Sequence, residues 1–323
     1  MTQARGQQAY LMRHELPESS YGVDPASVHS IKLPFNTSGI TATRNLIEPT
    51  TITGRRDAVA PAQGRRNVAG SVVVPIDQCA IGYWLEMLMG SPTTTPTGSA
   101  YQHVFKVSSV MKSYAIEQGH ADLSEYIKYS GMKANGFSMR IGGDEELTMS
   151  IDLIGQAEAM GGSSMSSRIT TLSFTRFHNA DAILQEGGTA LDGKVTELNL
   201  AVANNLDEAV YCIASGGGGK RGDLPEGLAH ATGDMRIMFE NRSYYLMAAS
   251  GSERSLTVTF RQNSFYLELD IDELIFERHT PPVETPLGLW VTLPFRAYYN
   301  DGSNASVIQA TLVNTWSAYS GHL

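Results

Sequence analysis

Cysteine is scarce in this chain of 323 residues, and the two that occur, Cys79 and Cys212, lie far apart in apolar runs. Two cysteines cannot build a disulfide framework, and by themselves they cannot complete a zinc site. We expect both to be buried, reduced thiols, as is typical of a protein made in a reducing cytoplasm. The class of small, disulfide-rich secreted proteins is therefore excluded.

Long apolar runs are absent as well. A membrane span needs about 18 consecutive apolar residues, and no stretch of the chain approaches that length. The N-terminal segment MTQARGQQAYLMRHELPE also lacks the apolar run of a signal peptide. We therefore expect neither membrane insertion nor export, and the glycosylation sequons at Asn36, Asn241 and Asn304 are expected to be chance matches.

An excess of positive charge is missing too. Charged residues make up only 18% of the chain, and the net charge is −9. A protein that holds nucleic acid by its phosphates normally carries the opposite sign. Hydrophobic residues make up 42%, which is enough for a sizeable core in one large domain or two domains of ordinary size.

A phosphate-binding loop is suggested by Gly216–Gly219 followed by Lys220, but the match fails. The pattern G-x-x-x-x-G-K-[ST] needs glycine at 214 and Ser or Thr at 221. This chain has Ala214 and Arg221 at those positions. We therefore expect no nucleotide cofactor.

Hydrolase and metal motifs are also lacking. No two histidines stand at metal-ligand spacing, and no G-x-S-x-G elbow occurs. Acidic clusters at 144–146 and 270–273 have the residue types of a glycosidase acid–base pair. They fall in a turn and on an alternating strand, however, where solvated carboxylates are expected. The sequence predicts no catalytic, cofactor-binding or metal-ligating residue, and therefore no enzyme.

Short segments rich in β-branched and aromatic residues dominate the chain, and most alternate apolar with polar residues, as half-buried strands do. Turn residues separate them, for example Asn204–Asn205, Gly142–Asp144, Arg261–Asn263 and Asn300–Gly302. The fold class is therefore mainly β. The expected strands are Ser71–Ile76, Leu123–Tyr129, Leu147–Ile154, Ile169–Phe174, Val195–Val202, Met235–Phe239, Leu256–Phe260, Phe265–Ile271, Leu289–Phe295 and Val307–Val313.

One clear helix is predicted at Asp77–Met89, with Asp77 as its cap and Gly90 as its stop. Its apolar residues recur at helical spacing, which predicts a broad stripe packed on the core. Two low-complexity stretches are expected to be irregular: Ser91–Ala100 as an exposed loop and Ala159–Ser167 as a flexible linker.

The order of elements repeats once along the chain. Strands at Ser30–Phe35 and Gly39–Ile47, a long loop, a strand and the helix are matched by Val195–Val202, Glu208–Ala214, a second long loop, a strand and a helical pattern at Glu240–Ala249. Gly54 and Gly219 are 165 residues apart, Gly70 and Gly233 163, Gly90 and Gly251 161, and Met149 and Trp290 141. The drop matches a stretch, Ser91–Val110, that the second half lacks.

Such a match in order, loop length and glycine placement predicts a duplicated domain. We expect an N-terminal arm (1–29), a first domain (30–175, with an insertion at 91–110), a linker (176–194) and a second domain (195–323). Each domain would be a β-sandwich or barrel with a flanking short helix. Tandem copies of one domain offer two quasi-equivalent faces, which suits head-to-tail closure into a ring.

Several segments together carry a resemblance. A long loop with Gly54–Arg56 precedes a Gly-Ser-Val strand, and a helix ending in Leu-Met-Gly follows it. The chain closes on LWVTLPFRAYYNDG (Leu289–Gly302) and VIQATLVNT (Val307–Thr315). From about residue 20 to 316, this order resembles the major tail tube protein family of long-tailed bacteriophages.

The resemblance implies a structural virion protein, made in the bacterial host cytoplasm, whose domains close into rings with a continuous inner β-barrel. Stacked rings would form the hollow tail tube through which double-stranded DNA is ejected without specific binding. Six domains per ring would come from three chains with two domains each, or from six chains. Other expected partners are the tape measure protein, the tail terminator and the distal tail or baseplate proteins.

Two groups of residues are candidates for the assembled tube. Basic residues on the long loops Glu48–Asn67 and Ala214–Ala231 would contact the next ring, and acidic residues on or beside strands would face the lumen and repel DNA phosphates. The basic candidates are Arg55, Arg56, Arg65, Arg66, Lys220 and Arg221, and the acidic candidates are Asp122, Glu125, Glu268, Asp270, Asp272 and Glu273.

Other interpretations remain open at this point. A β-sandwich module that binds carbohydrate or a host surface would share the turns and aromatic content. A β-scaffold glycosidase would need convergent carboxylates, for which no site stands out. A tail terminator or hub protein would share the tube fold.

Overall fold

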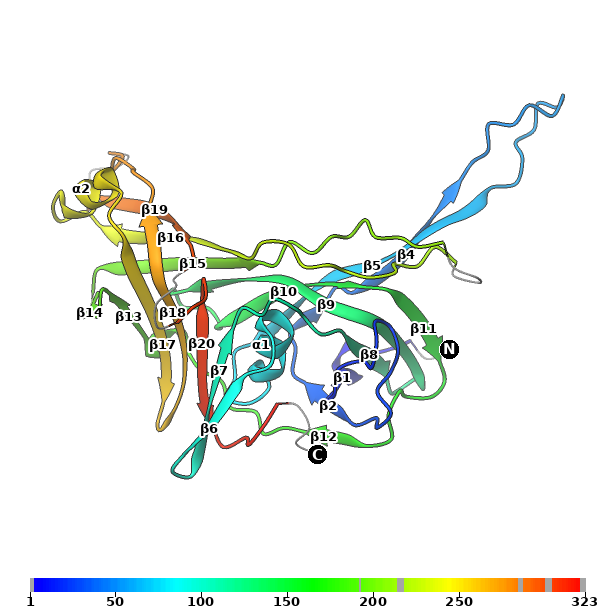
Figure 1. The fold of residues 1–323 in the computed structure, drawn as a ribbon, viewed down its shortest axis with the longest axis horizontal. Helices are drawn as coiled ribbons and strands as arrows, with labels where there is room; N and C mark the ends of the chain where they lie inside the picture. The colour runs from blue at the N-terminus through cyan, green and yellow to red at the C-terminus, as the bar shows by residue number, and fades with distance from the viewer. Residues whose placement is uncertain (1–2, 192, 214–217, 284–286, 300–303, 320–323) are drawn as a thin grey trace.

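Antiparallel strands dominate the molecule in the computed structural model, which describes residues 3–191, 193–213, 218–283, 287–299 and 304–319. The mainly β fold class is confirmed. Helix α1 (Ile81–Met89) lies near the centre and α2 (Ser243–Ser250) at one end (Figure 1). The strands up to residue 171 are β1 (Ala9–His14), β2 (Ser30–Leu33), β3 (Thr37–Ser38), β4 (Thr41–Ile47), β5 (Ala62–Pro75), β6 (Thr93–Thr97), β7 (Ala100–Lys106), β8 (Tyr114–His120), β9 (Glu125–Ile141), β10 (Thr148–Gly155), β11 (Ala157–Gly161) and β12 (Ile169–Thr171).

The later strands are fewer and start after a short irregular segment. They are β13 (Ala182–Glu186), β14 (Thr189–Ala190), β15 (Val195–Ala203), β16 (His230–Met238), β17 (Arg254–Gln262), β18 (Phe265–Phe276), β19 (Trp290–Ala297) and β20 (Gln309–Asn314). Every segment expected as a strand from its alternation overlaps one of the observed strands, and the predicted helices overlap α1 and α2. The expected turn at Asn300–Gly302 lies outside the described residues.

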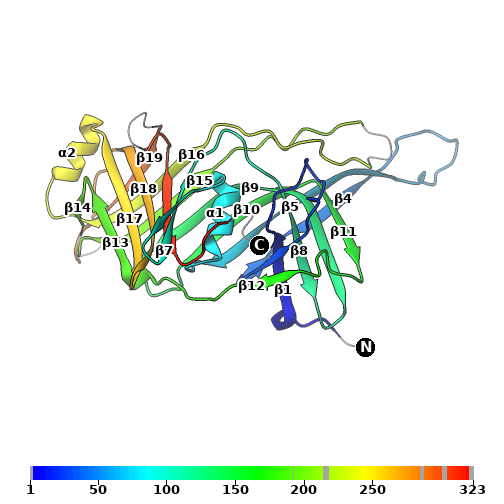
Figure 2. The ribbon, with the colours of Figure 1, turned by 60° about the horizontal axis from the view of Figure 1, so that its bottom comes forward.

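One run of eight antiparallel strands crosses the molecule in the order β4–β5–β10–β9–β15–β16–β19–β18. Strand β9 is long enough to belong to two layers. Its first part pairs with β8 and β11, and its second part pairs with β10 and β15. Strand β18 divides in the same way, because its first part pairs with β17 and β20 and its end pairs with β19. The two layers seen in Figure 2 are joined through these strands.

The strand pairings occur in two series with the same order. The pairs β4–β5, β5–β10, β10–β9, β8–β9, β9–β11 and β1–β8 have the counterparts β15–β16, β16–β19, β19–β18, β17–β18, β18–β20 and β13–β17. A register shift lies between Tyr114 and Ile116 in β8, and another between Arg254 and Leu256 in β17. The helices also correspond, since α1 follows β5 and α2 follows β16.

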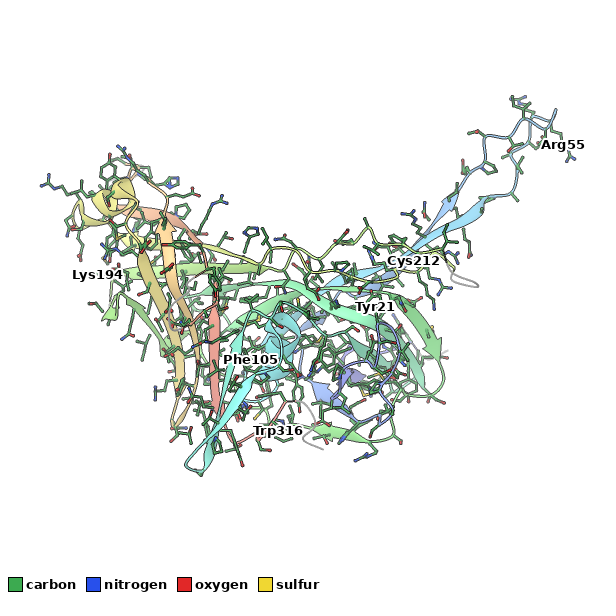
Figure 3. The ribbon with its side chains drawn as sticks, in the orientation of Figure 1. Tyr21, Arg55, Phe105, Lys194, Cys212 and Trp316 are labelled. Carbon is green, nitrogen blue, oxygen red and sulfur yellow. The ribbon has the colours of Figure 1, made fainter. Side chains whose placement is uncertain are left out.

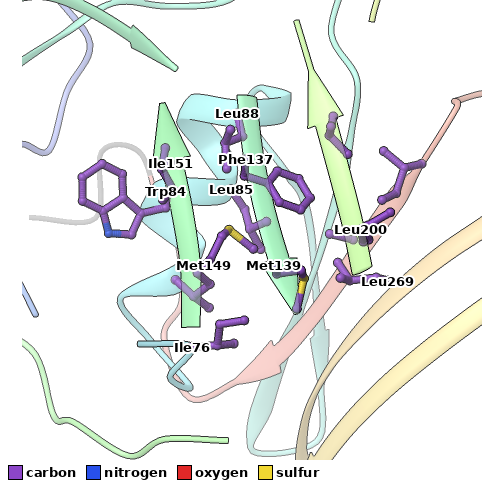
Figure 4. Close-up of a cluster of buried hydrophobic side chains, with 14 of the residues drawn as sticks. Ile76, Trp84, Leu85, Leu88, Phe137, Met139, Met149, Ile151, Leu200 and Leu269 are labelled. Atoms are coloured by element: carbon purple, nitrogen blue, oxygen red, sulfur yellow. The ribbon is translucent and has the colours of Figure 1, made fainter. Parts of the chain in front are cut away.

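The core forms between the sheets and α1, where all nine helix residues are buried. Trp84, Leu85 and Leu88 pack against the inward side chains of β9, β10 and β15 (Figure 4). The helix begins at Ile81 and not at Asp77 as predicted. Asp77 lies in the turn before it, where its carboxylate accepts hydrogen bonds from the backbone N–H groups of Cys79, Ala80 and Ile81. At Gly90 the backbone takes φ 109°, which favours glycine, and the helix ends there.

Several expectations for irregular or strand segments are wrong. Ser91–Ala100 is not a loop but contains β6, which pairs with β7, and β7 in turn pairs with β20. Ala159–Ser167 begins inside β11. Among the described residues of Glu208–Ala214 only an isolated bridge from Tyr211 to Arg221 occurs, and Cys212 is exposed rather than buried. These outcomes depend on contacts with distant segments, which override local composition.

A buried ion pair ties β1 to α1. The guanidinium of Arg13 donates to the carboxylate of Glu86, and both side chains are fully buried. Two rings flank the guanidinium carbon, with their centroids at 4.0 Å for Tyr114 and 4.8 Å for Tyr83. The cation is thus held by one carboxylate and two aromatic faces, which offsets part of its desolvation cost.

We expect Glu86→Ala to lower the free energy of unfolding of the monomer by about 3–5 kcal/mol, because it leaves a buried cation without its anion. The double variant Arg13→Met with Glu86→Leu should recover most of that loss, since it removes both charges. Urea unfolding followed by tryptophan fluorescence measures both.

The matched control is Arg140→Ala, which breaks an exposed pair with Glu197 and should cost no more than about 1 kcal/mol. A double variant as unstable as Glu86→Ala would show that the charges themselves are not what the core depends on.

Candidate assembly surfaces

The eight-strand run has one apolar and one polar face. Along β15, Leu198, Leu200 and Val202 point into the core, while Glu197 and Asn199 lie on the opposite face. This opposite face is hollowed across six neighbouring strands, β5, β10, β9, β15, β16 and β19. A sheet that keeps one concave face polar is suited to contact water or a hydrated ligand rather than a further protein layer.

Charges of both signs occur on this concave face. The guanidinium of Arg140 donates to Glu197 at 2.9 Å, and that hydrogen bond holds the pKa of the Glu197 carboxyl below its usual range. Arg296 donates to Glu277 at 3.2 Å. Asn199 donates to Asp234 at 3.1 Å. The arginines are therefore partly neutralised by neighbouring carboxylates.

None of the six predicted acidic residues is among those that line this hollow. Glu268, Asp270 and Asp272 share the outward face of β18, where Glu268 accepts from Thr259 at 3.0 Å. Desolvation and the neighbouring Asp270 raise the pKa of Asp272. Glu273 follows on the same strand, and its carbonyl accepts from the backbone N–H of Tyr298.

Asp122 and Glu125 are distant from that group, at the connection between β8 and β9 in the other layer. Asp122 accepts from the backbone N–H of Arg5 at 2.8 Å. Asp152, Glu197, Asp234 and Glu277 do lie on the polar face of the eight-strand run, and they were not singled out from the sequence. The first three could have been found as the polar positions in the alternating sequences of β10, β15 and β16.

A long hairpin arm leaves the body of the molecule between β4 and β5 (Figure 1). The connecting residues 48–61 are all exposed. Arg55 and Arg56 lie in this exposed part, with Arg55 far from the rest of the chain (Figure 3). Large apolar side chains are exposed there too, since Ile52 is 96% and Leu46 61% exposed. An exposed arm with apolar side chains is a candidate contact with another chain.

The base of the arm is supported by a second long excursion, residues 204–229, which connects β15 to β16. The Tyr211 hydroxyl donates to the carbonyl of Arg66 at 3.1 Å, and the backbone N–H of Arg66 donates to the carbonyl of Gly219 at 2.9 Å. The guanidinium of Arg65 lies 4.7 Å from the Tyr211 ring centre. Arg65 and Arg66 are thus next to Lys220 and Arg221, whereas Arg55 and Arg56 are remote from them.

Arg221 fastens this excursion to the strands beneath it, and it is only 3% exposed. One terminal nitrogen donates to the carbonyls of Val68 at 3.2 Å and Gly155 at 2.9 Å. The other donates to the side chains of Asn67 at 2.5 Å and Glu208 at 3.3 Å. Within the chain the guanidinium is therefore fully engaged. Lys220, by contrast, is partly exposed.

Leu224, three residues further on, is fully buried beside Met111, Ile154 and Tyr21. The ammonium of Lys133 donates to the carbonyl of Leu224 and to the Glu226 carboxylate, each at 2.9 Å. An arginine anchor and an aliphatic anchor thus hold the excursion on the first half of the chain.

In the described residues, no three His, Cys, Asp or Glu side chains come together in a way that suits a metal ion. None of the helices in the described ranges has the length and apolarity needed to cross a membrane.

Arg221→Ala should lower the free energy of unfolding by about 3 kcal/mol or more, because it leaves buried carbonyls without donors. We also expect faster hydrogen exchange and proteolysis in residues 204–229, with little change in α1. Hydrogen–deuterium exchange read by mass spectrometry measures the local effect. Lys220→Ala is the matched control, and an equal response in both variants would contradict the anchoring role.

Comparison with known proteins adds one match. A family model described as phage tail tube protein matches residues 5–297, which is nearly the whole chain. A comparison with curated protein sequences finds no match. Because the family match spans most of the fold described above, the chain belongs to the phage tail tube protein family, and it is a structural component of the virion tail.

Proposed function

We propose that copies of this chain close into rings and that stacked rings form the hollow tail tube through which DNA is delivered. The observation that carries the proposal is the seam between β9 and β15. This seam joins the two series of strand pairings inside one chain, and it offers a template for the seam between chains.

The two series are interpreted as two copies of one tube domain. Strands β4, β5, β10 and β9 make the first sheet unit, and β15, β16, β19 and β18 make the second. Gly70 and Gly233 have equivalent places, since Gly70 lies opposite Leu153 in β10 and Gly233 opposite Phe295 in β19. Added side chains would collide with backbone in both, at 2.2 Å from Gly39 O and Asn199 O.

Each unit has one edge that calls for a partner. Among the described residues, β4 pairs only with β5, whereas its counterpart β15 pairs with both β16 and β9. Placing β4 of one chain beside the end of β18 of the next repeats the β9–β15 seam. Three chains would then supply six units to one closed sheet, and closure removes exposed strand edges.

Within the chain Ala203 lies opposite Gly136, and Gly136 in turn lies opposite Asp152 of β10. The counterparts of Ala203 and Asp152 are Thr43 and Pro294, and the backbone N–H of Glu277 donates to the carbonyl of Pro294. Thr43 of one chain would therefore lie opposite Glu277 of the next. Pro281 and Pro282 have no N–H to donate, so this seam is expected to be shorter than the internal one.

The hollow polar face would then line the tube. Two of its arginines, Arg140 and Arg296, are paired with carboxylates, and the chain as a whole is acidic, so phosphate groups would find few free cations to hold them. The arms between β4 and β5 would reach neighbouring copies. The tape measure protein, tail terminator and distal tail or baseplate proteins remain expected partners, with assembly in the host cytoplasm.

Negative-stain electron microscopy of the concentrated protein should show hollow rods with regular transverse striations. Mass per ring from scanning transmission microscopy should equal three chains, because each chain supplies two units.

A mass of six chains per ring would agree with a tube but would contradict the proposal that each chain supplies two of the six units. A monodisperse monomer at every concentration, even when purified tail-tip complex is added as an initiator, would contradict tube formation.

A further inference from the structure

The two long excursions of the chain have equivalent places but different surroundings. Residues 204–229 connect β15 to β16, and their described parts, 204–213 and 218–229, lie on the first sheet unit, held there by Arg221 and Leu224. Residues 48–61 connect β4 to β5 and extend into solvent. The first sheet unit is the neighbour of β15 inside the chain, whereas β4 has no such neighbour among the described residues.

The two excursions have residues of the same type at corresponding positions in the sequence. Gly54–Arg55–Arg56 matches Gly219–Lys220–Arg221, so Arg56 is the counterpart of the buried Arg221. An aliphatic residue follows three positions later in both, Val59 in one and Leu224 in the other.

A carboxylate completes the match. Glu208, which accepts a hydrogen bond from Arg221, lies five residues after Ala203, the last residue of β15 that pairs with β16. Glu48 lies five residues after Thr43, the counterpart of Ala203. The arm therefore has counterparts of all three groups: Arg56 for the cation, Glu48 for the carboxylate and Val59 for the aliphatic side chain. Within its own chain it lacks the surface on which the other excursion buries them.

We propose that this arm is a clasp within the ring: Arg56 of one chain is buried on the second sheet unit of the neighbouring chain, as Arg221 is buried on the first sheet unit of its own. This proposal rests on the proposed ring. It assigns Arg56 to a contact between chains of one ring, distinct from any contact between stacked rings.

The receiving site follows from the strand register. Arg221 donates to the carbonyls of Val68 and Gly155, which lie opposite each other at the end of the β5–β10 ladder. The β16–β19 ladder ends in the same way, with Ala231 opposite Ala297. The carbonyls of Ala231 and Ala297 are therefore the expected acceptors for Arg56 of the neighbouring chain.

An apolar contact is expected beside this anchor. Lys133 of β9 contacts the Leu224 carbonyl and lies opposite Ile154 of β10. In the second unit, Ile275 of β18 lies opposite Arg296 of β19 and takes the place of Lys133. Val59 is 38% and Ile275 39% exposed in the isolated chain, and the clasp would bring these two side chains together.

Arg56→Ala tests the anchor, with Arg55→Ala as the matched control. Both side chains are exposed in the single chain, so neither variant should change the melting temperature of the monomer. We expect Arg56→Ala to raise the protein concentration needed for ring formation at least about tenfold, since buried charge-assisted hydrogen bonds are lost. Arg55→Ala should assemble rings at the wild-type concentration. Analytical ultracentrifugation measures both.

Val59→Cys with Ile275→Cys, in a Cys212→Ser background, tests the location. Mild oxidation should give covalent products that stop at three chains, because a clasp within a closed ring of three has no further partner. A ladder that extends beyond three chains would place the arm between stacked rings and overturn the proposal.

Two outcomes separate this inference from the proposed function. If the wild-type chain and Arg56→Ala form rings at the same protein concentration, the proposed clasp is wrong and the proposed ring is still supported. A wild-type chain that forms no ring under any condition would overturn both.

Discussion

Unpaired strand edges are the constraint on which this structure depends most. Strand β15 pairs along both of its edges inside the chain, with β16 and with β9. In the part of the chain that the structure describes, β4 pairs along one edge, with β5. An open edge with exposed apolar side chains beside it invites pairing with another chain. The same sheet geometry therefore accounts for the fold of one subunit and for the way in which we propose that subunits join.

Arg221 and Arg56 have corresponding positions in the two series of strand pairings, but their guanidinium groups have different surroundings. Arg221 is buried and donates to Val68 and Gly155, while Arg56 is exposed on the arm. A guanidinium with several fixed donors suits the ends of strand ladders, where carbonyls converge. Its burial is favourable only where those acceptors are within reach, which is why we propose acceptors on another chain for the exposed arginine.

Much of the strand content could be predicted from the sequence, because alternation in segments such as Leu256–Phe260 reports directly which side chains face the core. The family resemblance rested on the same strands and was confirmed. The strand β6 could not be predicted, because Thr93–Thr97 owes its order to β7 and, through β7, to the distant β20. The burial of Arg221 could not be predicted either, because a glycine-rich loop with basic residues is usually exposed to solvent. Its acceptors are the carbonyls of Val68 and Gly155, which are far away in the sequence.

The face on which each carboxylate lies could not be predicted from the sequence, and the reason is physical. Net charge is a property of composition, but the face on which a carboxylate lies depends on strand parity and on the bulges that change it. Glu268 and Asp270 lie on β18 beside β17 and β20, while Glu197 and Asp234 lie on the hollow face, with Glu197 paired to Arg140. A lumen built from this face would repel DNA less by free negative charge than by leaving few unpaired cations, and that condition depends on hydrogen bonds between neighbouring strands rather than on the overall charge of the chain.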